Sequence, residues 1–244
     1  MDRADPDRRQ EPRSAPRAGA SRPPGLAPAA HQVRPVRTGR PAARRRRGNP
    51  AGHGRTLSED AEDSMRIIAG EWRGRPLRAP EGDTTRPTAD RTRETLFSML
   101  ASRLGGFEGL AVADLFAGSG ALGLEALSRG AASAVFVEQD PAAVRAIRAN
   151  IAALRCAPQC DVRAASVLTL GPAKQPLDLV MLDPPYGTGA GAVAIDRLVR
   201  LGWIGEATWI SLETAVKEVP EVKVCTVDAQ RKVGKALLTL MRLK

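Results

Sequence analysis

The stretch that decides the fold is Leu177-Asp178-Leu179-Val180-Met181-Leu182-Asp183-Pro184-Pro185-Tyr186, in which an apolar run ends in an acid, two prolines and the chain's only tyrosine. The run has the length and composition of a buried strand, and it must end at the prolines because proline has no N–H to donate to a neighbouring strand. The segment 183–186 therefore follows the carboxyl end of a strand. In open sheets built from alternating strands and helices, ligands bind at that edge.

Strands and helices alternate through the chain on both sides of this stretch. Further strands are expected over 111–116, 134–138, 161–164 and 208–213, with helices over about 121–129, 140–154 and 190–201. An earlier helix is expected to begin with Thr88 as its N-cap and to end at Gly105. Two last extended runs, 223–227 and 236–241, are expected to pair as an antiparallel hairpin. The pattern predicts an α/β, Rossmann-like fold with a mostly parallel sheet of seven strands and helices on both faces.

A glycine-rich loop opens the helix that follows the 111–116 strand. Gly118, Gly120 and Gly123 have the spacing G-x-G-x-x-G, which is typical of dinucleotide-binding loops and serves S-adenosylmethionine (SAM) with the same geometry. Asp114 lies four residues before the loop, where it can accept bonds from a cosubstrate's ammonium group or organise the loop. Glu138 ends the next strand, where an acid binds ribose hydroxyls. A turn that binds nothing is the alternative, but acids at three strand ends favour a ligand site.

The first 64 residues differ in composition from the rest. They contain 14 Arg, 8 acids and 9 of the 19 prolines, with no Lys and no aromatic residue, so they are expected to form a disordered tail. Its run of four arginines, 44–47, suits either a nucleic-acid-binding arm or a solvated segment. Globular patterning begins abruptly at Met65, which suggests that Met65 is the natural start and that 1–64 is an upstream extension.

The residues available for catalysis are limited by composition. Both histidines lie in the tail, which excludes His-based triads and ordinary His-containing zinc sites from residues 65–244. The three cysteines, Cys156, Cys160 and Cys225, show no C-x-x-C pairing, and no metal site is expected. No apolar run approaches the roughly 20 residues of a membrane span, and no secretory signal is present. A cytoplasmic protein is the expectation.

The loop after the 177–182 run has a chemistry that needs no histidine. The exocyclic amino group of a base is a poor nucleophile because its lone pair is delocalised into the ring. Two acceptors on its N–H groups favour a lone pair directed at an incoming methyl group; Asp183 offers a carboxylate and Pro184 a carbonyl, held rigid by the fixed φ angles of Pro184 and Pro185. Tyr186 can stack on the base. These residues predict an amino-group methyltransferase in which catalysis is mainly alignment and desolvation.

The segment after Met65 has a pattern of its own. Two short extended pieces with glycines between them, over 65–80, indicate a small hairpin. Four arginines surround Trp72, namely Arg66, Arg73, Arg75 and Arg78, and interleaved basic and aromatic residues suit an RNA surface. The alternative is an edge hairpin whose tryptophan packs in the core.

Four motifs in this order resemble the RsmD family: 66–75 (RIIAGEWRGR), 86–97 (RPTADRTRETLF), 114–129 (DLFAGSGALGLEALSR) and 183–186 (DPPY). The resemblance covers about 65–244 and none of 1–64. It implies a SAM-dependent methyltransferase that modifies the N2 amino group of a guanine in 16S ribosomal RNA, within a small subunit or an assembly intermediate. We expect the protein to be a monomer. Together with the composition of 1–64, this gives an expected domain organisation of a tail over 1–64, an RNA-contacting hairpin over 65–80 and a class I methyltransferase domain over 81–244.

The resemblance also implies roles for individual residues. Catalysis is assigned to Asp183, Pro184, Pro185 and Tyr186. The residues expected to bind SAM are Asp114, Phe116, Ala117, Gly118, Ser119, Gly120, Glu138 and Ser166, and Ser166 stands where the family often has an acid or amide that contacts the adenine. The residues expected to bind RNA are Arg66, Trp72, Arg73, Arg75, Arg86 and Arg91.

Three other functions remain open from the sequence. The same loop chemistry suits an adenine-N6 methyltransferase acting on DNA or RNA, although such DNA enzymes usually have Asn in place of Asp183 and a target-recognition domain. A non-catalytic RNA-binding or ribosome-assembly factor could keep the same fold. A nicotinamide-dependent oxidoreductase could use the glycine loop.

Overall fold

A computed structural model describes residues 65–80 and 87–244, which belong to one compact unit. The 1–64 tail, the expected RNA contact at Arg86 and the side chain of Thr88 lie outside what the structure describes. The 3-10 turns η1 (Ala157–Gln159) and η2 (Val167–Thr169) flank the third strand. The helices are α2 (Pro87–Leu104), α3 (Ala121–Ser128), α4 (Pro141–Leu154) and α5 (Ala190–Arg200). The strands are β1 (Ala111–Leu115), β2 (Ser133–Glu138), β3 (Cys160–Ala164), β4 (Leu179–Leu182), β5 (Trp209–Ala215), β6 (Cys225–Val233) and β7 (Ala236–Leu243).

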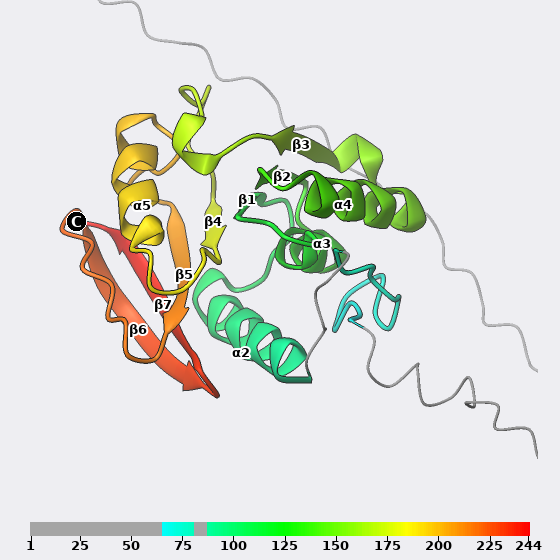
Figure 1. Ribbon diagram of the computed structural model, residues 1–244, viewed down its shortest axis with the longest axis horizontal. Helices are drawn as coiled ribbons and strands as arrows, with labels where there is room; N and C mark the ends of the chain where they lie inside the picture. Colours follow the sequence, from blue (N-terminus) through cyan, green and yellow to red (C-terminus); the bar gives the residue numbers. More distant parts are fainter. Residues whose placement is uncertain (1–64, 81–86) are drawn as a thin grey trace, which may run out of the picture. The chain divides into compact units, whose positions relative to one another are not determined.

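The seven strands form one sheet in the order β3-β2-β1-β4-β5-β7-β6 (Figure 1). The strands from β3 to β5 pair in parallel, whereas β7 lies antiparallel to both β5 and β6. The predicted fold class, with its terminal antiparallel hairpin, is confirmed. From β1 the chain moves outward to β2 and β3, and from β4 it moves outward to β5 on the other side. The crevice at the carboxyl ends of β1 and β4 is therefore the topological switch point, where ligands bind in such sheets.

Most predicted boundaries differ by one or two residues at most, and two differences have a clear physical reason. The first long helix begins at Pro87, so the assignment of Thr88 as an N-cap is wrong; proline suits the first helical position because its fixed φ matches and its missing N–H has no helical partner. The strand β6 spans nine residues and not the five of the predicted run. Its polar middle, 228–232, gave no strand pattern because β6 is an edge strand with largely exposed side chains.

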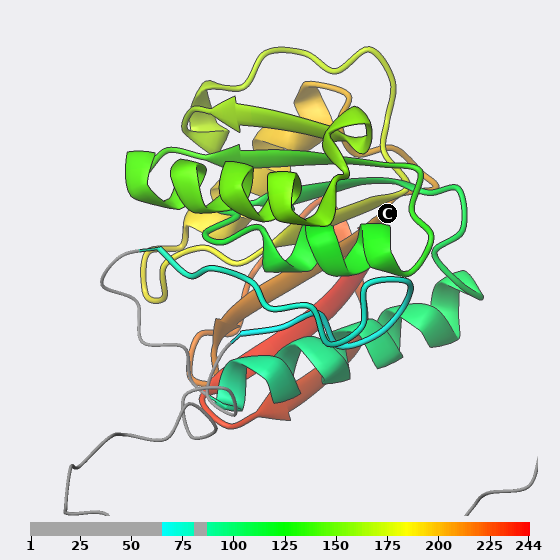
Figure 2. The same ribbon diagram turned by 90° about the vertical axis from the view of Figure 1, so that its right-hand side faces the viewer.

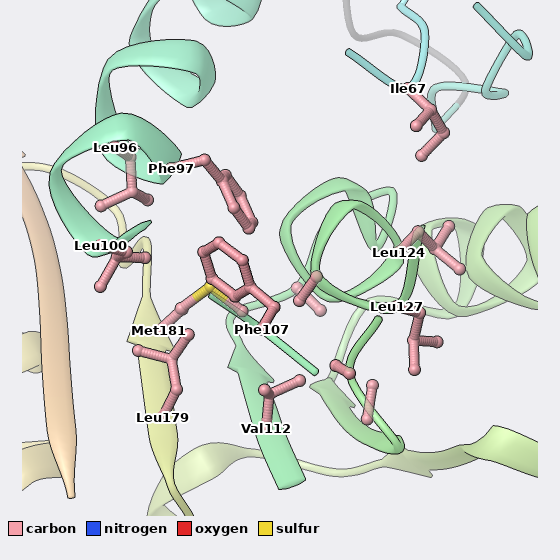
Figure 3. Packing of buried hydrophobic residues seen from close by; sticks show 14 of the residues in the cluster. Ile67, Leu96, Phe97, Leu100, Phe107, Val112, Leu124, Leu127, Leu179 and Met181 are labelled. Atoms are coloured by element: carbon pink, nitrogen blue, oxygen red, sulfur yellow. The ribbon is translucent and has the colours of Figure 1, made fainter. Parts of the chain in front are cut away.

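Hydrophobic side chains are buried on both faces of the sheet. On one face, α2, α3 and α4 cover the strands, and Phe97 and Phe107 meet with ring centroids 5.2 Å apart above Met181 (Figure 3). On the other face, Ile195 and Leu198 of α5 pack over the strands. The carboxyl ends of β1 and β4 therefore lie between helices packed on both faces of the sheet.

The segment 65–80 folds back on itself and docks beside α2 and α3 (Figure 2). It holds one isolated antiparallel bridge, between Arg66 and Pro76, flanked by further backbone hydrogen bonds. At Gly70, where φ is +87°, an added Cβ would lie 1.8 Å from the Ser128 carbonyl oxygen, so only glycine permits this close approach. Glu71 N–H donates to that same oxygen at 2.7 Å.

A buried carboxylate holds this segment in place. The side chain of Glu125, on α3, is fully buried and accepts hydrogen bonds from the backbone N–H groups of Ile68 at 2.7 Å and Ala69 at 3.0 Å. The Arg129 guanidinium pairs with it at 2.7 Å, and Arg93 lies 3.9 Å from its other oxygen. A buried charge is tolerated when its lone pairs are satisfied in this way, and it is costly to remove one partner.

We predict that Glu125→Ala lowers the free energy of unfolding by about 3 kcal/mol, because it leaves two backbone N–H groups and a guanidinium without their acceptor. Urea denaturation measures the loss, and faster amide exchange at Ile68 and Ala69 locates it. Glu94→Ala, an exposed change on α2, is the control and should shift stability by less than about 0.5 kcal/mol. An equal effect of the two substitutions would contradict the role of Glu125.

Candidate active site

A cavity of about 1140 Å³ opens at the carboxyl edge of the sheet. Its wall is built from the ends of β1, β2, β4 and β5, the glycine loop, the start of α2 and the turn between β6 and β7. Of the residues predicted to bind the cosubstrate or to act in catalysis, those lining the cavity are Asp114, Phe116, Ala117, Gly118, Ser119, Glu138, Ser166, Asp183, Pro184, Pro185 and Tyr186. The fold thus brings together residues more than 70 positions apart in the sequence.

Gly120 is absent from the cavity wall. It is the N-cap of α3 with φ +78°, and an added Cβ would lie 3.3 Å from both Phe136 and Ile147. Its role is to turn the chain tightly into the helix. The third glycine of the motif, Gly123, permits closer packing still, since a Cβ there would meet the Phe136 ring at 2.4 Å.

Asp114 is buried at the floor of the cavity, 1% exposed. One carboxylate oxygen accepts the N–H of Gly123 at 2.8 Å, in the first turn of α3. Burial raises the pKa of Asp114 to about 7, and the hydrogen bond from Gly123 opposes that rise. Of the two roles that the sequence left open, organising the loop is the one seen in these contacts.

Glu138 fixes the glycine loop to the end of β2. One oxygen accepts the N–H of Gly118 at 2.8 Å, and the other accepts those of Gln139 at 2.7 Å and Asp140 at 2.9 Å. A carboxylate has about four lone-pair sites, so three backbone donors leave room for a hydroxyl. The neighbouring residue Asp140 is the N-cap of α4, and its side chain accepts the N–H of Ala142 at 2.7 Å.

Two further cavity residues, Phe116 and Ser166, differ in what their local structure shows. Phe116 has φ +59°, a left-handed conformation that a bulky residue rarely adopts and that is common at functional sites. Ser166 caps η2 by accepting the N–H of Leu168 at 3.3 Å, and its side chain also lines the cavity.

Asp183 faces the cavity directly after β4. Its backbone N–H donates to the Leu115 carbonyl at 3.3 Å, which extends the pairing of β4 with β1 by one step. The side chain is open to the cavity, but protein surrounds it on its other sides, and this burial raises the pKa of Asp183 well above its usual range. The carboxylates of Glu213 and Asp114 raise it further.

Tyr186 is held at its hydroxyl end by an acid that the sequence analysis did not select. The hydroxyl donates to Glu213 Oε1 at 2.6 Å, and 46% of the residue remains exposed. The backbone of the same loop is held by Glu218, which accepts the N–H groups of Gly187 at 2.8 Å and Gly189 at 3.4 Å. Tyr186 is therefore held at the cavity wall by its hydroxyl, with nearly half of the residue still exposed.

Charges on the cavity wall are mostly negative. The cavity wall carries four acids, one at or near the end of each of four strands: Asp114, Glu138, Asp183 and Glu213. Its two cations are Arg93, a buried arginine of α2, and Lys235, an exposed lysine of the β6–β7 turn. Arg93 already pairs with Asp90 at 2.9 Å and donates to the Arg66 carbonyl. A cavity of this charge favours a cationic ligand.

The residues predicted to contact RNA differ in their exposure to solvent. Arg66, Arg73, Arg75 and Arg91 are exposed, and Arg75 also donates to the Ala153 carbonyl at 2.8 Å. Trp72 is only 8% exposed and packs in the core of the α2–α3 face, so the structure favours the packing role over base stacking. In the sequence, a tryptophan next to glycines and arginines has the same pattern whether it packs in the core or stacks on a base, so the sequence could not distinguish the two roles.

Sequence reasoning missed Arg93, Glu213 and the turn 233–236, all of which line the cavity. Glu213 had a signal, because it follows the apolar run 209–212 as Asp183 follows its own strand. The turn had none, since its place depends on β7 returning antiparallel beside β5.

Comparison with known proteins identifies the family. The family model described as "Conserved hypothetical protein 95" matches residues 65–242. The Escherichia coli K12 protein named "Ribosomal RNA small subunit methyltransferase D" is 40% identical over 153 residues, 63% of this chain and 76% of the relative. The chain belongs to the RsmD family. The member of the same name from Haemophilus influenzae is 40% identical over 159 residues, 64% of this chain and 81% of the relative.

Two solved structures, a putative methyltransferase and a hypothetical protein, share the fold. The Escherichia coli protein yhhF superposes with a TM-score of 0.64 at 35% identity, over 74% of this chain and 98% of that one. A Thermus thermophilus protein gives a TM-score of 0.57 at 28% identity, over 73% of this chain and 99% of that one.

We predict that Asp114→Asn removes a pH dependence of stability. The pKa of Asp114 is about 7 in the folded chain and about 3.8 unfolded, so this side chain stabilises the fold below about pH 4 and loses that contribution as pH rises through about 7. At about 1.4 kcal/mol per pH unit, the wild type should lose up to about 4 kcal/mol relative to the variant between those pH values. Parallel curves of unfolding free energy against pH, measured by urea denaturation, would contradict the assignment.

Proposed function

We propose that this protein transfers a methyl group from SAM to the exocyclic N2 amino group of a guanine in small-subunit ribosomal RNA. The observation that carries the proposal is the convergence of the glycine loop and the Asp183–Tyr186 loop on one acidic cavity. The names of its RsmD relatives support rRNA as the substrate. We propose that the enzyme is a cytoplasmic monomer that acts on a small subunit or assembly intermediate. Within the described residues, no helix combines the length and apolarity needed to cross a membrane.

The donor set in one half of the cavity fits SAM. Glu138 would hold the ribose hydroxyls, Asp114 would face the ammonium group, and the left-handed turn at Phe116 would bring the backbone of the loop close to the ligand. Ser166 would approach the adenine. The negative wall complements a sulfonium cation, and bound SAM supplies an electrophilic methyl group whose departure leaves a neutral thioether.

The other half of the cavity presents the acceptor. Asp183 and the Pro184 carbonyl would accept hydrogen bonds from the N2 amino group, which holds the nitrogen and directs its lone pair. Tyr186 would stack on the guanine. Asp183 takes a proton as the new N–C bond forms, and a carboxylate with a raised pKa is suited to that task.

The exposed arginines offer a surface for the RNA backbone. Arg66, Arg73 and Arg75 of the segment 65–80, together with Arg91 of α2, are proposed to contact phosphates. Trp72 is left out of this surface because its ring is buried.

Asp183→Asn is expected to reduce methyl transfer by at least about 100-fold, because the amide cannot take the proton and is a weaker acceptor. Incorporation of labelled methyl into 30S subunits, naked rRNA and DNA measures the activity, and calorimetry with SAM checks binding. Asp178→Asn is the matched control, since Asp178 precedes the same strand outside the cavity and its bond to Ala111 N–H can be kept by an amide. Label entering DNA adenine and not rRNA guanine would overturn the proposed function.

Arg73→Ala is expected to weaken binding to RNAs of any sequence by a similar factor. Loss of one phosphate contact should reduce the slope of log affinity against log salt concentration by about 1. Arg200→Ala, an exposed arginine at the end of α5 on the opposite face of the sheet, is the control and should leave the slope unchanged. An unchanged slope for Arg73→Ala would remove this residue from the RNA surface.

A further inference from the structure

The structure places a second carboxylate beside the proposed catalytic one. β4 and β5 pair in parallel with Leu182 opposite Leu212, so the next residues in register are Asp183 and Glu213. Neighbouring strands lie about 4.8 Å apart, and residues at equivalent register positions project to the same side of a sheet. Both residues line the cavity.

This pair is electrostatically unfavourable in the protein alone. Like charges opposite each other on adjacent strands are destabilising. Among the described ion pairs, none involves Asp183 or Glu213. The pKa of Asp183 is raised by Glu213, and burial raises the pKa of Glu213 itself. Such a costly arrangement at a cavity wall is typical of residues kept for a ligand.

Glu213 has one oxygen in use. Oε1 accepts the Tyr186 hydroxyl at 2.6 Å, whereas Oε2 has no hydrogen bond to any residue that the structure describes. The carboxylate can therefore accept one further donor from a base held against Tyr186.

We propose that Glu213 accepts a hydrogen bond from the N1–H of the target guanine and so selects guanine over bases that have a lone pair at N1. The inference rests on the proposed function and adds a determinant of base specificity to it. Guanine carries its N1–H and its N2 amino group side by side on one edge, and the two adjacent carboxylates offer acceptors to both. Adenine presents a lone pair at N1, which would face the carboxylate without a proton between them.

The charged groups around Glu213 bear on its protonation. Asp183 lies beside it on β4, Asp114 lies on β1, Lys235 lies in the β6–β7 turn and Arg93 lies on α2, and Tyr186 donates to it directly. The hydroxyl bond and a sulfonium cation bound in the same cavity both favour the ionised carboxylate. In that form Glu213 is an acceptor only.

The test compares guanine with 2-aminopurine, which keeps the 2-amino group but has a lone pair at N1. Small-subunit RNA is prepared with either base at the position that the wild-type protein methylates, and kcat/KM is measured for each. We expect the wild type to prefer guanine by at least about tenfold, the scale of a hydrogen bond to a charged group. In Glu213→Ala the guanine preference should fall by at least about tenfold relative to wild type. Because 2-aminopurine also lacks O6, the change between variants, and not the absolute preference, isolates the contact to N1.

Two further variants separate base selection from support of Tyr186. Tyr186→Phe removes the hydroxyl but keeps Glu213, so the preference should be retained even as both rates fall. Glu213→Gln keeps the size of the side chain and can present either C=O or NH₂ to N1, so its preference for guanine over 2-aminopurine should also drop. This variant replaces Glu213→Ala in the test if Glu213→Ala fails to fold, as judged by thermal melting and SAM calorimetry.

The outcomes distinguish this inference from the proposed function. If N2-methylguanosine forms but Glu213→Ala, Glu213→Gln and Tyr186→Phe all slow both substrates by one common factor, Glu213 only positions Tyr186 and the inference is overturned. If the wild type forms no N2-methylguanosine in small-subunit RNA, the proposed function fails, and the inference fails with it.

Discussion

The parallel pairing of β1 with β4 at the centre of the sheet is the constraint on which the site depends. It sets Leu115 opposite Leu182, and the bond from Asp183 N–H to the Leu115 carbonyl carries the ladder one step past the strand. The glycine loop after β1 and the Asp-Pro-Pro-Tyr loop after β4 are thereby held at one edge. A methyl donor and an amine in two halves of the same cavity require this proximity, because the proposed catalysis is mainly alignment.

The fold accommodates its buried carboxylates in two different ways. Glu125, on α3 and away from the proposed site, is fully buried but surrounded by donors, and it anchors the segment 65–80. Asp183 and Glu213 form no ion pair with the residues described, and burial raises the pKa of each. In this protein a buried carboxylate with hydrogen-bond donors around it supports the structure. The carboxylates beside the cavity that lack an ion-pair partner are the ones proposed to take part in the chemistry.

The sequence was sufficient for the fold class and for the strand ends that carry three of the acids on the cavity wall. Strand ends followed by glycines or prolines are local signals, and they placed Asp114, Glu138 and Asp183 correctly at one edge of a seven-stranded sheet. Features that depend on long-range contacts were not visible. Trp72 is buried because residues 65–80 dock on α3, and the turn 233–236 reaches the cavity because β7 pairs with β5.

Nucleoside mass analysis of small-subunit rRNA from cells with and without this gene tests the central claim most directly. The proposed function predicts that the rRNA of the deletion strain lacks one N2-methylguanosine that the parent strain contains, and that the gene restores it while its Asp183→Asn form does not. Unchanged N2-methylguanosine in the deletion strain, or loss of a methylated adenine in its place, would contradict the account.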